Sequence, residues 1–286
     1  MLVIVGFVIV LFSVLGGFIM EGGQLLVLFQ PAEFVIIGGA MVGSIIVSLP
    51  IKTLKLMISQ IKGTLGSPPT KESFTSILVM LYEIFQIARK DGLVALEAHI
   101  EKPEESTVIS KYPDFLKDHH LLAFFADTMR LIQSGVVPAH DLEALIDTDL
   151  DIHHEEVGKP SAALSKVGDS LPGLGIVAAV LGVVITMGAI GGPAEQIGHK
   201  VGAALVGTFL GILLCYGFVQ PLSNNMEGVV KQKSQYYTLI KQALLGFHKG
   251  MAPSIAVELG RRSISADFRP GFVELEEACR ASREKG

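Results

Sequence analysis

Apolar residues in this chain are collected into four long blocks rather than spread evenly. Asp, Glu, Lys and Arg are missing from Met1–Met20, Phe34–Ile51, Ser170–Ala194 and Val201–Met226. A helix that crosses the apolar core of a bilayer needs about 20 residues, and each block meets or nearly meets that length. The first block lacks the basic start and the cleavage site of a signal peptide. The pattern predicts four membrane-spanning helices, at about residues 1–20, 34–51, 170–191 and 201–222.

The segments between and after these blocks have the pattern of soluble amphipathic helices. Apolar residues recur at helical spacing from Thr70 to Lys90, and further such stretches cover 93–101 and 119–134. Another helix is expected to begin near Pro138 and to end at Gly158 and Pro160, because proline disrupts a helix interior. No strand-like alternation of useful length occurs. We therefore predict an all-α integral membrane protein with a large helical insert and a helical tail.

The distribution of Lys and Arg predicts the orientation in the membrane. The connection from Glu21 to Glu33 has neither residue, and the link between the third and fourth blocks has Lys200 alone. Lysines instead follow the second block, precede the third and follow the fourth. Positive loops remain cytoplasmic, so both termini and the middle segment are predicted to be cytoplasmic. The expected organisation is a first membrane hairpin (1–51), a cytoplasmic helical domain (52–169), a second hairpin (170–226) and a cytoplasmic tail (227–286).

The composition agrees with a membrane protein and excludes several other classes. Of 286 residues, 50% are hydrophobic and only 18% are charged, whereas about a quarter are charged in a typical soluble protein. This apolar content excludes a disordered chain. A net charge of −5 gives no reason to expect nucleic acid as a partner. Two cysteines cannot form a disulfide framework.

None of the four apolar blocks contains Asp, Glu, Lys, Arg or His. Proton relays and ion pumps normally place an ionisable side chain inside the membrane. Thr186 and Thr208 are among the few polar residues at depth, and a hydroxyl cannot bind and release a proton near neutral pH. The sequence therefore predicts either that the chain moves no ions or that a partner supplies a carboxylate.

Small residues and prolines mark the membrane helices. Gly39/Gly43 and Gly207/Gly211 have the GxxxG spacing that allows helices to approach closely, either within the chain or between subunits. Pro172 and Pro221 are both expected near the cytoplasmic membrane face. They are either helix-boundary residues or part of a functional element.

No residue pattern in the chain is typical of an enzyme or of a cofactor site. His153-His154-Glu155-Glu156 could suggest a metal site, but at most two adjacent helical residues share a face. No nucleophile elbow or phosphate loop is present. Arg89, Lys90 and Glu97 lie on either side of Gly92 and form either a solvated helix end or a docking patch.

Three motifs, together with the layout of two membrane hairpins, resemble the MotA family of flagellar motor stator subunits, within the MotA/TolQ/ExbB superfamily. VGDSLPGLGIVAAVLG at Val167–Gly182 is similar to the third membrane helix of that family. VGTFLGILL at Val206–Leu214, continuing to Pro221, is similar to the fourth helix. The tail combines PSIAVELGRR at Pro253–Arg262 with RPGFVELE at Arg269–Glu276.

The resemblance implies a motor subunit of the bacterial inner membrane rather than an enzyme. A MotB-like single-span subunit would supply an intramembrane aspartate, with five A subunits around two B subunits in the lipid. Ion flow past that aspartate would turn the ring. In this family the equivalents of Pro172 and Pro221 couple ion passage to movement, and those of Arg89 and Glu97 engage the FliG-like switch protein of the rotor. Lys90 is an additional positive charge beside them.

The resemblance also bears on the choice of ion. Sodium-driven relatives have a threonine seven residues after the equivalent of Pro172, where this chain has Ala179, while Thr208 is present in both types. Because sodium requires oxygen ligands, we expect proton drive. Two alternatives remain open at this point, an ExbB/TolQ-like energising subunit and a passive membrane scaffold.

Overall fold

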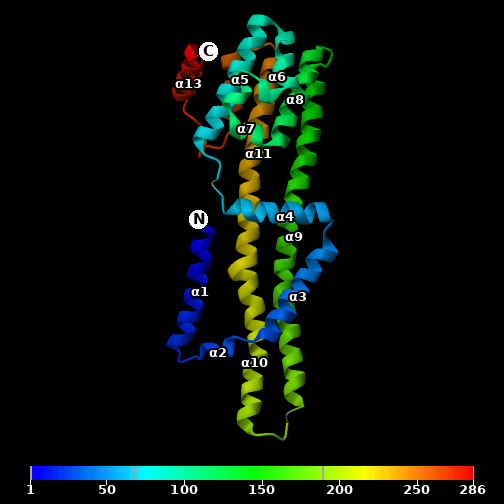
Figure 1. Ribbon diagram of the computed structural model, residues 1–286, viewed down its shortest axis with the longest axis vertical. Helices are drawn as coiled ribbons and strands as arrows, with labels where there is room; N and C mark the ends of the chain where they lie inside the picture. Colours follow the sequence, from blue (N-terminus) through cyan, green and yellow to red (C-terminus); the bar gives the residue numbers. More distant parts are fainter. Residues whose placement is uncertain (1, 67, 189, 286) are drawn as a thin grey trace. The chain divides into compact units, whose positions relative to one another are not determined.

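A computed structural model describes residues 2–66, 68–188 and 190–285, and no strand occurs among them. Most of the described residues are helical, which confirms the all-α prediction (Figure 1). The chain divides into two compact units. The membrane unit comprises Met1–Ser67 and Val157–Val230, and the charged unit comprises Pro68–Glu156 and Lys231–Gly286.

The membrane unit contains the apolar blocks, and four helical segments are long and apolar enough to cross a membrane. This confirms the four predicted spans. They are α1 (Leu2–Met20), α2 (Leu25–Leu28) with α3 (Pro31–Ser48), the second part of α9 (Ala139–Met187), and α10 (Ala194–Leu213) with the start of α11 (Gln220–His248). The second span begins earlier than the sequence pattern suggests, because Pro31 opens α3 and Glu33 lies in its first turn. None of the described residues of α1 is buried, so its apolar surface is left for lipid or for other subunits.

The end expected at Gly158 and Pro160 is wrong, because α9 continues through both residues and through Pro172. A proline inside a helix removes one backbone hydrogen bond and frees carbonyl groups of the preceding turn. Side chains compensate here. Gln60 of α4 (Ile51–Thr64) donates to the carbonyl oxygen of Val157 at 2.8 Å, and Ser161 donates to that of Gly158 at 3.0 Å. In Figure 1, α4 runs crosswise to α9.

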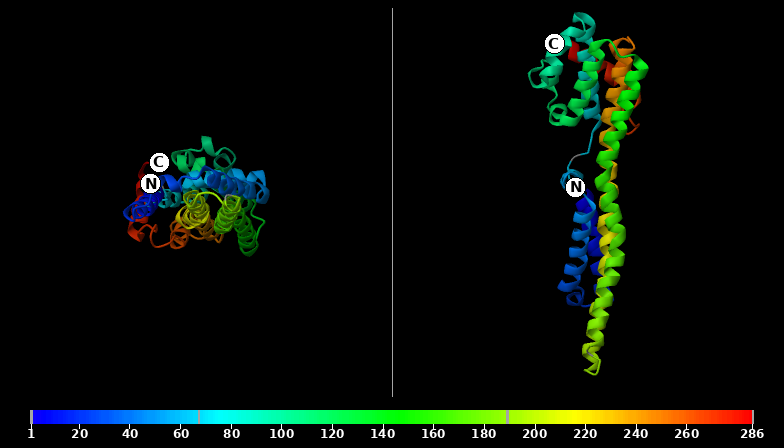
Figure 2. Two further views of the ribbon diagram at one scale, coloured as in Figure 1. Left: turned by 90° about the horizontal axis from the view of Figure 1, so that it is seen from below. Right: turned by 90° about the vertical axis from the view of Figure 1, so that its right-hand side faces the viewer.

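A seam of small residues brings α9 and α10 into close contact. A Cβ on Gly211 would lie 2.5 Å from the backbone oxygen of Leu171 and 2.8 Å from the Cα of Gly175. The two helices lie side by side in Figure 1, and in the right-hand view of Figure 2 they overlap along their length. The Gly207/Gly211 spacing therefore serves packing within the chain. A Cβ on Gly39 or Gly43 would meet nothing within 4 Å among the described residues.

The helix that contains the fourth apolar block continues past its predicted end near residue 222. After α10, residues Leu214–Val219 form a π-helical turn, and α11 then extends from Gln220 to His248. A π turn is a frequent way to accommodate a local disruption within a long helix. Here it ends two residues before Pro221, which has no backbone N–H to donate.

The charged unit is built around a buried apolar core. Its helices are α5 (Lys71–Asp91), α6 (Glu97–Glu101), α7 (Pro113–Lys117), α8 (His119–Ser134), α12 (Pro253–Arg262), α13 (Phe272–Lys285) and the remaining parts of α9 and α11. Thr70 and Ser73 form a capping box at the start of α5. The ring of Phe85 stacks on that of Phe247, with centroids 4.4 Å apart. Lys241 forms a short ion pair with Asp147, which links α11 to α9.

Candidate functional site

A polar cluster ties α9 to α11 between the two prolines predicted to matter for coupling. The side-chain amide of Gln220 donates to Asp169 Oδ1 at 2.6 Å and to the backbone oxygen of Ser165 at 3.1 Å. Ser165 Oγ donates to Gln220 Oε1 at 3.2 Å. Pro221 follows Gln220 directly, and Pro172 lies about one turn beyond Asp169. Because Pro172 lies inside α9, it is not a helix-boundary residue.

The predicted path residues are spread along the α9–α10 hairpin. Ala179 and Thr208 are half-buried and close together, since the backbone nitrogen of Ala179 lies 3.1 Å from where a Cβ on Gly207 would stand. Thr186 is completely buried, and its hydroxyl donates to the backbone oxygen of Gly182 at 2.8 Å. It lies about 21 Å further along α9 than Pro172. The structure thus groups Ala179 with Thr208 and leaves Thr186 nearer the end of the helix.

The structure also reveals a carboxyl group that the sequence pattern missed. Glu33 is only 7% exposed, and its Oε2 has no hydrogen-bond partner among the described residues. This oxygen lies 2.6 Å from the position that a Cβ on Gly207 would take. Glu33 lies just outside the charge-free block predicted from the sequence but inside the candidate span Leu25–Ser48. A charge-free block starting at Phe34 excludes Glu33, although Pro31 and an acidic residue in the first turn are typical of a helix start.

The predicted rotor-facing charges lie on an exposed corner of the charged unit. Arg89 and Lys90 occupy the last turn of α5, and Glu97 begins α6. Gly92 separates them with φ +87°, a conformation that favours glycine. All three charged side chains are exposed, and no ion pair involves them within the described part of the chain. Unpaired charges of both signs are thus available for a partner.

The two tail motifs contact each other through a charged network. Glu258 of α12 accepts hydrogen bonds from Arg261 at 2.6 and 2.8 Å and from Arg262 at 2.8 Å. These hydrogen bonds, chiefly those from Arg261, lower the pKa of Glu258 to about 2. Arg261 also donates to the backbone oxygen of Pro270 at 3.0 Å, which joins the first tail motif to the second. The motifs therefore have a structural role in the tail.

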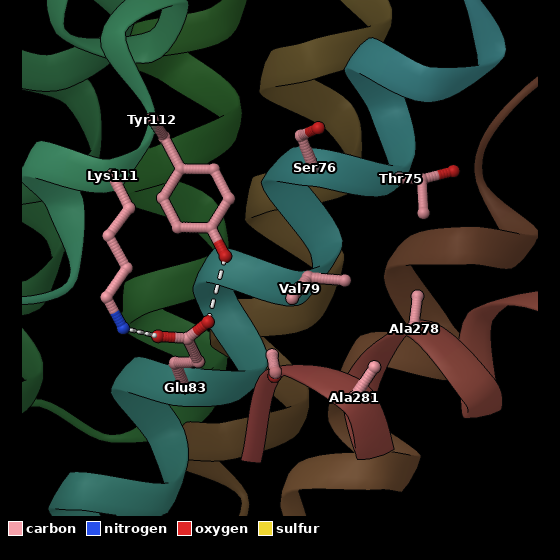
Figure 3. Close-up of a pocket in the computed structure, with 9 residues that line it drawn as sticks. Thr75, Ser76, Val79, Glu83, Lys111, Tyr112, Ala278 and Ala281 are labelled. Atoms are coloured by element: carbon pink, nitrogen blue, oxygen red, sulfur yellow. Dashed lines mark hydrogen bonds and ion pairs between the residues drawn. The ribbon is translucent and has the colours of Figure 1, made fainter. Parts of the chain in front are cut away.

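One pocket of the charged unit is lined by α5, α13 and the 3-10 turn before α7 (Figure 3). Glu83 accepts a hydrogen bond from the Tyr112 hydroxyl at 2.9 Å and forms an ion pair with Lys111 at 3.0 Å. These polar groups satisfy one another. Among the described residues, no group of three or more His, Cys, Asp or Glu side chains is arranged to hold a metal ion.

The sequence matches two family models. The motility protein A N-terminal model matches residues 4–92, and that of the MotA/TolQ/ExbB proton channel family matches residues 117–238. Motility protein A of Escherichia coli strain K12 is 43% identical over 98% of this chain and 96% of that protein. Chemotaxis protein LafT of Vibrio parahaemolyticus is 38% identical over 95% of both chains.

Solved structures show the same fold. A structure of C. jejuni MotAB matches with a TM-score of 0.74 at 20% identity, covering 93% of this chain and 96% of that one. The flagellar MotAB stator complex from Bacillus subtilis matches with a TM-score of 0.68 at 22% identity, covering 89% and 92%. The similarity to relatives above 30% identity extends over nearly the whole chain, and the chain therefore belongs to the motility protein A family, within the MotA/TolQ/ExbB superfamily.

Proposed function

We propose that this chain is the A subunit of an ion-driven flagellar motor stator in the bacterial inner membrane, with both termini in the cytoplasm. The observation that carries the proposal is the 43% identity with a motility protein over 98% of the chain. Lysines follow the second span, precede the third and follow the fourth, which supports a cytoplasmic location for both termini. The four spans support insertion into lipid.

The chain would act together with a MotB-like single-span subunit that contributes an intramembrane aspartate. We propose five copies of this chain around two copies of that partner. The unburied surface of α1 and the open glycines Gly39 and Gly43 support this assembly, because they offer apolar and closely approachable faces to other helices.

Proton flow would drive the ring, and the α9–α10 hairpin would transmit its effect. Ala179 offers no hydroxyl to a sodium ion, which favours protons. Thr208 and Thr186 would line the path. Pro172 and Pro221 flank the Gln220 cluster on helices that continue without a break into the charged unit, so a change near the prolines could reach the rotor-facing surface.

The rotor contact would be electrostatic. Arg89, Lys90 and Glu97 are exposed and free of ion pairs within the described residues, as a docking patch for a FliG-like switch protein requires. Charges in such a patch act on steering and register more than on raw affinity.

Complementation in a bacterium that lacks its own stator genes tests this function. Co-expression of the chain with a MotB-like partner should restore swimming, and the two proteins should co-purify from the membrane. Restoration of energised outer-membrane transport without swimming would instead support an ExbB/TolQ-like subunit. A scaffold without ion coupling predicts that Pro172→Ala and Pro221→Ala are silent.

A further inference from the structure

The membrane unit contains a buried carboxyl group, one oxygen of which has no hydrogen-bond partner among the described residues. Glu33 lies in the first turn of α3, nine residues into the candidate span Leu25–Ser48. More than nine-tenths of the residue is buried, and Oε2 finds no donor among the described residues. Ile37, one turn further along α3, is completely buried in the same packed region.

The carboxyl group lies directly against the small-residue seam of the α9–α10 hairpin. A Cβ on Gly207 would stand 2.6 Å from Glu33 Oε2, 3.1 Å from the Ala178 Cβ and 3.1 Å from the Ala179 nitrogen. Only the missing side chain at Gly207 leaves room for the carboxyl group there. Ala179 and Thr208, two of the proposed path residues, lie at the same level of the hairpin.

Along the helices that pack against this position, charged residues are several turns away in sequence. The nearest charged residues along the helices that pack against it are Asp169 on α9 and Lys200 on α10. They lie nine residues from Ala178 and seven residues from Gly207, or about 13 and 10 Å along the helix axes. Leu2–Met20 of α1 and the rest of α3 contain none.

The chemistry of such a group follows from its surroundings. An ionised carboxylate that is buried without a partner is strongly unfavourable, whereas the protonated acid is neutral and can both donate and accept a hydrogen bond. Ionisable residues inside membrane segments are uncommon and mark ion paths or proton relays. Taking up a proton forms one O–H bond and giving it up restores the carboxylate, with no other bond changed.

We propose that Glu33 is a proton-binding carboxyl of the ion path, contributed by this chain itself. The proposal rests on the proposed stator function and adds a second acidic group to the aspartate of the partner. In the proposed orientation, α3 begins at the outer side of the membrane, so Glu33 receives protons before they reach the partner. The space left by the missing side chain at Gly207 holds the Glu33 carboxyl group at the level of Ala179 and Thr208.

The test uses the full complex with its MotB-like partner, reconstituted into liposomes that contain a pH-sensitive dye. Glu33→Gln keeps the size of the side chain but cannot take up a proton, and Glu33→Asp keeps a titratable group. Glu21→Gln is the matched control, because Glu21 lies in the same outer connection but is exposed. We expect Glu33→Gln to lower proton flux on the order of a hundredfold. Glu33→Asp should retain part of the flux, and Glu21→Gln should match the wild type.

Infrared difference spectra between acidic and neutral pH provide a readout that a purely structural role would not change. The carboxylic acid C=O band of Glu33 should be missing in Glu33→Gln and present in Glu21→Gln. If Glu33→Gln does not insert, the same band should be shifted in Glu33→Asp. Wild-type flux in an inserted Glu33→Gln complex, or a band unchanged by both substitutions, would overturn the proposal. A wild-type complex that conducts no ions would instead refute the stator function itself.

Discussion

The close contact between α9 and α10 allows a quantitative prediction for Gly211→Ala. The new Cβ would lie 2.5 Å from the Leu171 oxygen and 2.8 Å from the Gly175 Cα. Ordinary carbon–oxygen contacts begin near 3.3 Å, and carbon–carbon contacts are optimal near 3.5–4.0 Å. Because both obstacles are backbone atoms, the helices must separate by about 1 Å. Overpacking of this kind costs about 1–3 kcal/mol, and the better helix propensity of Ala returns up to about 1 kcal/mol. We expect a net loss of about 1–2 kcal/mol.

The assay is reversible unfolding of the purified chain in mixed micelles, followed by circular dichroism. Gly198→Ala is the matched control, since it makes the same change in the same helix at an exposed position with nothing within 4 Å. This control should be neutral or stabilised by up to about 1 kcal/mol. Equal effects of the two substitutions, or a stabilised Gly211→Ala variant, would refute the packing argument.

Three further predictions concern the prolines, the exposed charges and the tail. Pro172→Ala and Pro221→Ala should insert and assemble normally but reduce torque in tethered-cell rotation, and unchanged torque would argue against coupling. Arg89→Glu or Glu97→Lys should slow association with the rotor protein about tenfold or more, with partial rescue by opposite charges on the rotor; equal rates would remove the docking assignment. Glu258→Gln should destabilise the tail by about 1–2 kcal/mol at pH 7, after allowance for solvent screening. Because the folded pKa of Glu258 is about 2, against 4.5 ordinarily, this stabilisation is present above pH 4.5 and is lost as the pH falls towards 2. Unfolding of the wild type and of Glu258→Gln should be followed by circular dichroism at decreasing pH. The variant should lose less stability than the wild type between pH 4.5 and 2, and identical acid profiles would contradict this assignment.

Much of the fold follows from the sequence because the bilayer imposes a simple rule. A span needs about 20 apolar residues whatever its neighbours are, so four charge-free blocks were enough to predict four spans. The continuity of α9 could not be predicted in the same way. Pro160 is tolerated inside α9 because Gln60, which is distant in sequence, donates a hydrogen bond to a carbonyl oxygen in the preceding turn. A prediction from local helix propensity does not include such a partner.

The candidate site was predictable only in part. The sequence predicts that Arg89 lies at an exposed helix end before a glycine, and in the structure Arg89 lies in the last turn of α5, before Gly92. Glu33 was missed because its burial depends on Gly207, which lies in another membrane helix. A rule that ends a membrane block at the first charged residue places Glu33 in a loop. A helix-start signature at Pro31 would have placed it inside the helix.

The rotation speed of a bead attached to a flagellum reports directly which ion drives the motor. The motor should contain only this chain and its MotB-like partner as stator, and both the proton gradient and external sodium should be varied. We expect the speed to fall in proportion to the proton gradient, to reach zero when the gradient is collapsed, and to be independent of sodium. Rotation that continues without a proton gradient, or that follows external sodium, would contradict proton drive.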